Sequence, residues 1–235
     1  KNYFYPDLPK GYQITSQPDP FVIGGFVDIG GGKKIEIDHI HLEEDAAKNV
    51  HTDTATLVDF NRAGAPLIEI VTKPELRSAK QARLFLQELQ MLIRYLGISD
   101  ADMEKGHMRM DVNVSIRPVG DEALYPRTEI KNMNSFKSVE RAADYEIKAQ
   151  TKLWEQHKAP EQFRTCGWDD AAGVTLEQRV KEAAADYRYF PEPDIPPLRI
   201  TQQDLERIAK RIPELPIQRR DRVREEYFLS YSDAK

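Results

Sequence analysis

Ten consecutive residues, from Met108 to Arg117, alternate between apolar and polar side chains without interruption. Successive side chains of a β-strand point to opposite faces of its sheet, so this pattern predicts a strand with one packed face and one polar face. Asp111 and Asn113 share the polar face, although both residue types are poor strand formers. Two interpretations of this face are open: an ordinary solvated surface, or the floor of a polar pocket.

A second apolar stretch, within Ala65 to Glu75, has an acid, Glu69, in the middle of its apolar residues. The stretch is typical of a strand buried on both faces, where a lone carboxylate costs several kcal/mol unless its charge is compensated. Four explanations are open: an edge strand with Glu69 in water, a buried arginine partner, a protonated acid, or a bound metal ion. The apolar neighbours of the acid are Leu67, Ile68, Ile70 and Val71.

The rest of the pattern predicts an α+β chain in which helices cover an antiparallel sheet. The apolar parity of one expected strand slips near His39, which predicts a bulge or a strand end there. Helices are expected over 78–96 and 135–157, each capped by a serine, with a shorter one over 202–212. Strands are expected over 21–29, then beyond a glycine turn at 30–32, around Phe163 and around Val174, and as a pair over 55–60 and 66–71.

Composition limits the class of protein. The chain has 235 residues with 40% hydrophobic and 31% charged residues, a net charge of −5 and one cysteine, Cys166. A globular protein without an internal disulfide is expected, and a cytoplasmic location suits the lone thiol. No apolar run reaches the roughly 18 residues that a membrane helix needs. No basic block stands out, so any contact with RNA is expected to be local.

Acidic residues near the expected break suggest a metal site. Glu43, Glu44 and Asp45 follow that break, and together with Glu69 they offer oxygen ligands of the kind that Mg²⁺ prefers. The histidines at 39, 41 and 51 match no zinc spacing. A carboxylate-lined metal site beside a polar sheet face fits phosphoryl transfer and two-metal hydrolysis of nucleic acid about equally.

Six blocks of sequence carry a family resemblance. They are "KNYFYPDLPKGYQI", "HLEEDAAK", "LVDFNRAGAPLIEIV", "MEKGHMRMDVNVSIRP", "EIKNMNSF" and "DYRYFPEPDIPPL". In this order they resemble the B subunit of the aspartyl/glutamyl-tRNA(Asn/Gln) amidotransferase, over residues 1 to about 215. The resemblance implies a catalytic cradle domain similar to glutamine synthetase and the guanidino kinases.

The resemblance also implies a function, an ATP-dependent ligase reaction. A subunit of this family uses Mg²⁺ and ATP to phosphorylate the side-chain carboxylate of Glu or Asp misacylated on tRNA-Gln or tRNA-Asn. Ammonia from an amidase (A) subunit then displaces the phosphate, and a small C subunit completes the heterotrimer. The location implied is the bacterial cytoplasm, or an organelle matrix in eukaryotes.

Site residues follow from the matched blocks. The resemblance assigns Glu44 and Glu69 to the Mg²⁺ ligands, and it answers the question of Glu69 in favour of a metal on an inner strand. It also implies a catalytic floor and a set of nucleotide or substrate contacts. The floor residues are Glu104, Arg109, Asp111 and Asn113. The contact residues are Lys1, Lys131, Asn132 and Asn134.

Two departures from the family pattern and two missing parts qualify the match. Lys105 stands where the family often has a second acid, which puts the role of that acid in doubt, and Met110 replaces a cysteine at a packing position. The upstream strand that completes the family's metal site is missing, as are the C-terminal tRNA-binding domains. A fragment is therefore expected, with 1–200 as an incomplete cradle and 201–235 as the start of a helical region, inactive alone. The rival functions are a metal-dependent nuclease and a non-catalytic scaffold for tRNA and partner proteins.

Overall fold

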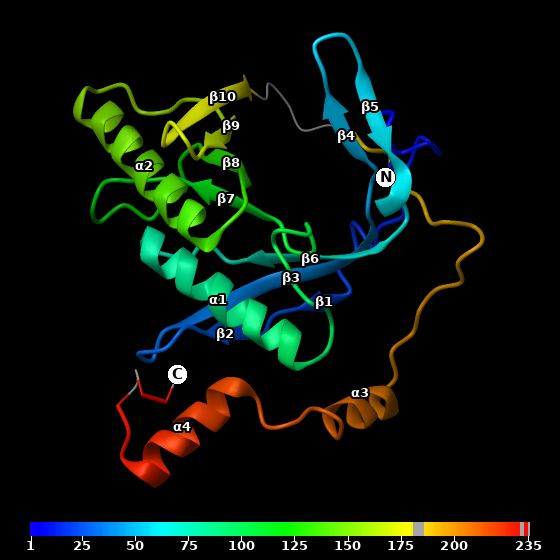
Figure 1. Cartoon of the computed structure of the whole chain (residues 1–235), viewed down its shortest axis with the longest axis vertical. Coiled ribbons are helices and arrows are strands. Elements are labelled where there is room, and N and C mark those ends of the chain that lie inside the picture. The colour runs from blue at the N-terminus through cyan, green and yellow to red at the C-terminus, as the bar shows by residue number, and fades with distance from the viewer. Residues whose placement is uncertain (181–185, 231–232, 235) are drawn as a thin grey trace. The chain divides into compact units, whose positions relative to one another are not determined.

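The structure is a computed structural model that describes residues 1–180, 186–230 and 233–234. The chain has α+β architecture, as expected, and its strands and helices form two compact units (Figure 1). Unit 1 comprises Lys1–Val27, Lys34–Glu75 and Ala185–Gln202. Unit 2 comprises Asp28–Lys33, Leu76–Ala184 and Gln203–Lys235. None of the helices in the described ranges combines the length and the apolar character that crossing a membrane requires.

One long strand, β3, organises the sheet of unit 1. It pairs with β1, β2 and β6, and Ile40 of β3 lies between a β1 residue and a β6 residue on opposite edges. The register against β6 shifts between Ile37 and His39, so the bulge expected near His39 is confirmed. The strand does not end there but runs on to Glu44. The four strands are β1 (Val22–Ile23), β2 (Phe26–Asp28), β3 (Lys34–Glu44) and β6 (Pro66–Thr72).

The strand pair expected between 55–60 and 66–71 is wrong. Strand β5 (Thr56–Asp59) pairs with β4 (Lys48–His51) in a separate two-stranded hairpin, while β6 pairs with β3 (Figure 1). The intervening residues form a 3-10 turn, η1 (Phe60–Arg62), which redirects the chain. The Arg62 side chain anchors this turn, because it donates to the carbonyls of Ala46 and Ala47.

Unit 2 contains a four-stranded sheet in the order β10-β9-β8-β7. Neighbouring strands are antiparallel, as expected, except β8 and β9, which are parallel. The reason is the connection: α2 joins β8 to β9 as a crossover helix, which parallel strands require. The bounds are β7 (Met110–Val114), β8 (Thr128–Met133), β9 (Arg164–Asp169), β10 (Val174–Val180) and α2 (Phe136–Glu155).

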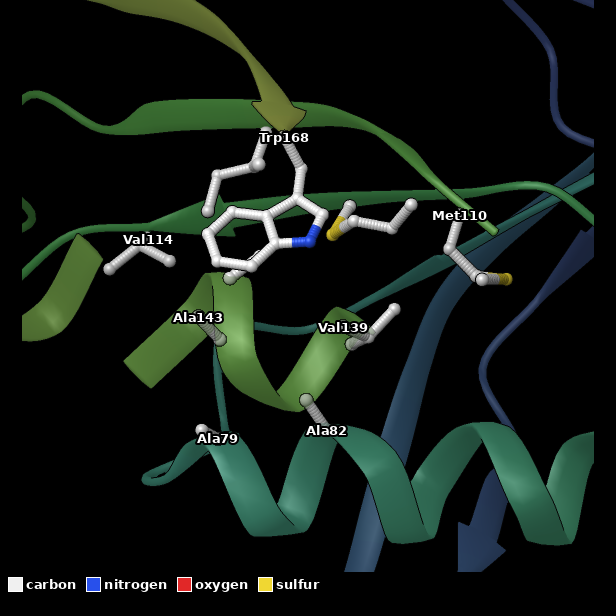
Figure 2. Close-up of a cluster of buried hydrophobic side chains, with 10 residues drawn as sticks. Ala79, Ala82, Met110, Val114, Val139, Ala143 and Trp168 are labelled. Atoms are coloured by element: carbon white, nitrogen blue, oxygen red, sulfur yellow. The ribbon is translucent and has the colours of Figure 1, made fainter. Parts of the chain in front are cut away.

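The core of unit 2 lies between one face of this sheet and two helices, α1 (Ala79–Tyr95) and α2 (Figure 2). Both helices begin where expected, because Ser78 and Ser135 each accept a hydrogen bond from a backbone N–H of the first turn. The short helix expected over 202–212 is confirmed as α3 (Gln202–Ala209), and a further helix, α4 (Pro216–Tyr227), follows it. The core residues are Ala79, Ala82, Met110, Val114, Ile130, Met133, Val139, Ala142, Ala143 and Trp168.

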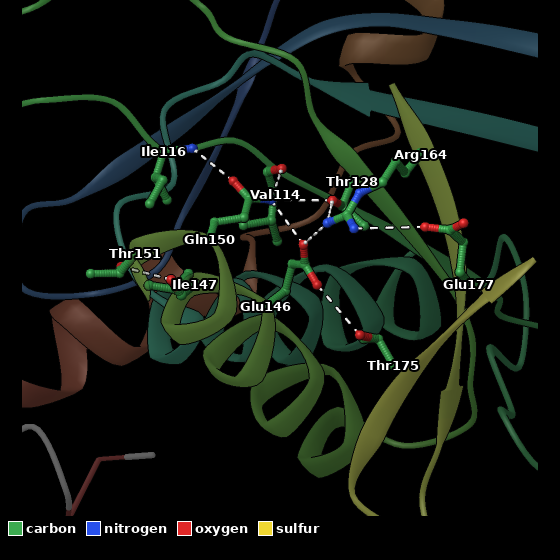
Figure 3. Close-up of polar contacts among 10 residues, drawn as sticks. All are labelled: Val114, Ile116, Thr128, Glu146, Ile147, Gln150, Thr151, Arg164, Thr175 and Glu177. Carbon is green, nitrogen blue, oxygen red and sulfur yellow. Dashed lines mark hydrogen bonds and ion pairs between the residues drawn. The ribbon is translucent and has the colours of Figure 1, made fainter. Parts of the chain in front are cut away.

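A buried polar network also links α2 to the sheet (Figure 3). Glu146 and Gln150, one turn apart on α2, are each 1% exposed. Glu146 accepts from Gln150 at 3.0 Å and from Arg164 of β9 at 3.2 Å. Gln150 in turn donates to the carbonyl of Val114 on β7 at 3.0 Å. Because its partners come from two strands, the network fixes the position of α2 on the sheet of unit 2.

Candidate functional site

Two acids of unit 1, Glu43 and Glu69, lie on one face of its sheet. Residues directly opposite each other on antiparallel strands share a face, and His41 of β3 lies opposite Glu69 of β6. Glu43 is two residues beyond His41, so it lies on the same face as a diagonal neighbour of Glu69. The structure therefore brings Glu43 and Glu69 together.

Glu69 is exposed, and β6 pairs only with β3 in the described parts of the chain. The expectation of an inner strand buried on both faces is therefore wrong. The apolar run suggested a buried strand, but Val, Ile and Leu are also common in edge strands, whose faces can be partly exposed. Glu69 lies at an edge of the sheet, where water or a ligand can reach it.

The segment at 13–17 supplies neutral hydrogen-bond donors to these two acids. Gln13 and Thr15 donate to the two carboxylate oxygens of Glu43, at 3.3 and 2.9 Å. Gln17 donates to Oε2 of Glu69 at 3.2 Å. The three donors sit at alternate positions because this segment is extended beside β3, with Thr15 bridged to Glu43. The acids are thus oriented without being neutralised.

Glu44 has a different environment. As the next residue along β3, it points by strand alternation to the face opposite Glu43 and Glu69. Its carboxylate pairs with Lys10 and accepts the backbone N–H of Ile14 at 2.8 Å. The predicted pair of Glu44 and Glu69 is therefore split between two faces in this structure.

Glu43 and Glu69 define what we call the acidic face of unit 1. A segment from the C-terminal part of unit 1, residues 187–189, packs beside this face. The backbone N–H of Asn2 donates to the carbonyl of Tyr187 at 2.8 Å, and the Tyr189 hydroxyl donates to Gln17 at 2.5 Å. The ammonium group of Lys1 lies 4.8 Å from the centre of the Tyr187 ring. The block "DYRYF" and predicted contact residue Lys1 thus meet at one side of the acids.

The acidic face suits a magnesium ion that also binds a substrate phosphate. Among the residues that the structure describes, no three His, Cys, Asp or Glu side chains converge on a possible metal position. Mg²⁺ commonly takes only one or two carboxylates and completes its shell with water and phosphate oxygens. Glu43 and Glu69 meet that need, since both are held by neutral donors and share one face.

Unit 2 presents a second polar face, on the side of its sheet away from the core. Lys131 of β8 pairs with Asp111 of β7 and lies 3.5 Å from Glu129. Burial lowers the pKa of Lys131, but the hydrogen bond and charge of Asp111, with Glu129, outweigh it and leave this pKa raised. Asn113 accepts from Arg127 at 3.0 Å. The alternation predicted from Met110 to Val114 is confirmed by burial, with Asp111 and Asn113 exposed.

A bulge in β8 shapes this polar face. Met133 lies opposite Met110 and Ile130 lies opposite Val112, so β8 holds one extra residue in this interval. Asn132 occupies the bulge with a φ of 67°, a conformation that Asn tolerates better than most residues. As a result Ile130 and Met133 are both buried, while Lys131 and Asn132 between them both reach the polar side.

The other predicted residues lie in loops around β7 and β8. Glu104 is exposed in a turn where the Asp102 carboxylate accepts its backbone N–H at 3.0 Å. Arg109 and Asn134 are exposed just before β7 and just after β8. Sequence reasoning missed the residues that hold the acids, although the alternation of Gln13, Thr15 and Gln17 was a readable signal.

The fold and these faces define an α+β domain with polar sites on two separate sheet faces. Residues 1–206 match the GatB/GatE catalytic domain, and the chain belongs to that family. Three similar proteins are each named as the B subunit of an aspartyl/glutamyl-tRNA(Asn/Gln) amidotransferase. Those of Caldicellulosiruptor saccharolyticus and Symbiobacterium thermophilum are 51% identical over the whole chain, which covers 50% of their length. That of Thermus thermophilus is 51% identical over 95% of the chain and 47% of its own length. The chain thus spans about half the length of the curated relatives it matches.

Proposed function

We propose that this chain is the catalytic part of a kinase subunit in a tRNA-dependent amidotransferase. The substrate is Glu or Asp misacylated on tRNA-Gln or tRNA-Asn. A side-chain carboxylate oxygen attacks the γ-phosphorus of ATP, ADP leaves, and an acyl phosphate forms. Ammonia then attacks the acyl carbon, phosphate leaves, and the amide remains after loss of a proton. The match over residues 1–206 to a catalytic family supports this proposal.

The acidic face of unit 1 is the proposed position of Mg²⁺, with Glu69 as one ligand. When bound, Mg²⁺ neutralises charge between the phosphates and the substrate carboxylate. Glu43 is the second ligand that the sheet geometry favours, because it shares the face of Glu69. The family resemblance favours Glu44 instead, whose carboxylate is engaged by Lys10 and Ile14.

The polar face of unit 2 is proposed to bind the phosphates or the aminoacyl end. Lys131 supplies a positive charge, and Asp111 holds its ammonium group on this face. Asn132 is directed to the same side by the bulge, and Asn113 of β7 shares this face, opposite Glu129. Lys1, Glu104, Arg109 and Asn134 stay proposed contacts from the loops.

The proposed partners are the amidase (A) subunit, which supplies ammonia, and the small C subunit. The proposed location is the cytoplasm, where charged tRNA is used. Both proposals rest on the names of the relatives, each of which is the B subunit of an amidotransferase.

The test is ATP-dependent phosphorylation of Glu-tRNA-Gln by the complete protein with its partner subunits. Glu69→Gln is expected to lower this rate at least about 10²-fold, because a ligand of the phosphoryl-transfer metal is lost, while glutamine hydrolysis continues. Glu43→Gln and Glu44→Gln form a matched pair that identifies the second ligand, since the geometry predicts the larger loss for Glu43→Gln.

Three outcomes would overturn parts of this proposal. A normal rate for Glu69→Gln at ordinary Mg²⁺ removes the acidic face from the site. A larger loss for Glu44→Gln than for Glu43→Gln replaces Glu43 by Glu44. Cleavage of RNA without ATP would replace the kinase by a metal-dependent nuclease.

A further inference from the structure

We propose that Gln17 and Tyr189 are positioning residues, which hold the Glu69 carboxylate in the orientation that a divalent cation requires. The inference rests on the proposed function, because it presupposes a cation at Glu69. The Tyr189 hydroxyl donates to Oε1 of Gln17 at 2.5 Å, and Nε2 of Gln17 donates to Oε2 of Glu69 at 3.2 Å. The three side chains thus form a chain of two hydrogen bonds that ends on the acid.

The first hydrogen bond determines the direction of the second. A glutamine amide has one accepting end and one donating end. When Oε1 of Gln17 accepts the hydrogen bond from the hydroxyl, the N–H₂ group points to the other side. There it meets Oε2 of Glu69, and the second carboxylate oxygen stays available for a cation. Without the hydroxyl, the amide of Gln17 can rotate and present its carbonyl oxygen to the acid.

Gln17 also connects the two acids of the face. Its backbone N–H donates to the Thr15 hydroxyl oxygen at 3.2 Å, and that hydroxyl donates to Glu43 at 2.9 Å. A shift of Gln17 is therefore transmitted to both Glu69 and Glu43. The hydrogen bonds that Thr15 and Gln17 donate to the two acids are therefore coupled, unlike an isolated surface contact.

Tyr189 is itself held in place by its own segment. Residues 187 and 188 accept hydrogen bonds from Asn2, at 2.8 and 3.2 Å, so the backbone on which Tyr189 sits is fixed to the start of unit 1. Burial, and then the charges of Tyr187, Glu43 and Glu69, raise the pKa of the Tyr189 hydroxyl. The hydroxyl therefore keeps its proton at neutral pH and acts as a donor.

Residues that hydrogen-bond a metal ligand commonly contribute about 10- to 100-fold to metal affinity. Gln17 contacts the acid directly, so its loss falls within that range. Tyr189 acts through Gln17, so its loss is smaller, about threefold to tenfold for one neutral hydrogen bond. A larger loss of metal affinity for the Gln17 variant than for the Tyr189 variant is expected from a chain of hydrogen bonds. A general loss of folding would not produce this order.

The experiment is a Mn²⁺ titration of the complete protein without ATP, followed by the electron paramagnetic resonance signal of free Mn²⁺. We expect Gln17→Leu to raise the Kd about tenfold and Tyr189→Phe to raise it by less, with the Tm unchanged. The double variant is expected to match Gln17→Leu alone, because both changes interrupt the same chain. Tyr187→Phe is the matched control: it alters the same segment, keeps the ring beside Lys1, and should leave Kd unchanged.

The outcomes separate the two proposals. If Glu69→Gln leaves the Mn²⁺ affinity unchanged, the cation site itself is wrong. If Glu69→Gln weakens binding while Gln17→Leu and Tyr189→Phe do not, only the positioning role is wrong. Equal effects of Tyr187→Phe and Tyr189→Phe would also overturn it, because the hydroxyl of Tyr189 would then have no specific part.

Discussion

The two four-stranded sheets each carry acids on one face, but they compensate those acids in different ways. In unit 2, Asp111 pairs with Lys131, so the negative charge is balanced within the sheet. In unit 1, Glu43 and Glu69 are held by neutral side chains, and neither forms a salt bridge within the residues that the structure describes. Unit 1 therefore keeps negative charge on this face, which supports the proposed cation, whereas unit 2 presents a balanced surface.

The opposite faces of the two sheets differ as well. In unit 2 that face packs on α1 and α2, and Ile130 at its centre is 0% exposed. In unit 1 the face opposite the acids carries Leu42 and Ile68, directly paired across β3 and β6, and these are 37% and 43% exposed. Ile130 is therefore fully packed, whereas Leu42 and Ile68 are only partly covered.

A charge introduced on each of these faces gives the largest expected effect. Ile130→Asp buries a carboxylate in the core of unit 2 and should lower the free energy of unfolding by several kcal/mol. Leu42→Asp lies on a partly exposed face and should cost less, about 1 kcal/mol, because Asp is a poor strand former and some apolar contact is lost. Urea unfolding of both variants measures the difference. Equal losses would show that the two faces are packed alike.

Several features could be predicted from local sequence because local chemistry determines them. Ser78 and Ser135 cap their helices, since a serine followed by an apolar stripe needs no distant partner. The alternation around Asp111 and Asn113 was enough to separate a packed face from a polar one. The bulge near His39 was visible as a slip in parity.

Other features depend on partners far away in the chain and were not predictable. The partner of β6 is β3, although β5 is closer in sequence. The polar face of β6 holds Glu69, whose donor Gln17 is itself contacted by Tyr189, 172 residues away from Gln17. A parity rule assigns a side chain to a face, but it does not say which strand lies alongside.

A substitution in β9 tests the polar face of unit 2, and its expected effect on stability is intermediate in size. A Cβ added at Gly167 would lie 2.7 Å from Nε2 of Gln178 and 3.1 Å from Nδ2 of Asn132. Both amides come from bulges, one in β8 and one in β10 where the register shifts between Glu177 and Arg179. Gly167→Ala should therefore destabilise unit 2 by about 1 kcal/mol or less, because the Gln178 amide is flexible and can move.

The control is the double variant Gly167→Ala with Gln178→Ala, which removes the closer amide. Thermal unfolding should show most of the loss recovered. If the double variant is as unstable as the single one, the cost arises from the β9 backbone and not from the amides above it.

The smallest expected effects come from removing one acid in each sheet. The two substitutions should change the free energy of unfolding in opposite directions. Asp111→Asn removes the partner of a half-exposed lysine, so it should lower the free energy of unfolding by about 0.2–1 kcal/mol. Glu69→Gln removes one of two like charges that lie roughly 7 Å apart, so it should raise that free energy by a few tenths of a kcal/mol without divalent cations. Both changes should shrink in high salt, because exposed charges are screened.

The pH dependence of the Asp111→Asn effect follows from the raised pKa of Lys131. A group whose pKa is higher in the folded than in the unfolded state contributes stability that is complete below the unfolded value, about 10.4 for lysine. That contribution is lost as pH rises through the folded pKa, so wild type and Asp111→Asn should differ near pH 7 and converge as pH rises through the raised pKa of Lys131. Glu69→Gln has no such partner lysine, so its stabilising effect should persist across this range. If Glu69→Gln destabilises the protein as Asp111→Asn does, the acids of unit 1 are compensated internally, and the reason for placing a cation there disappears.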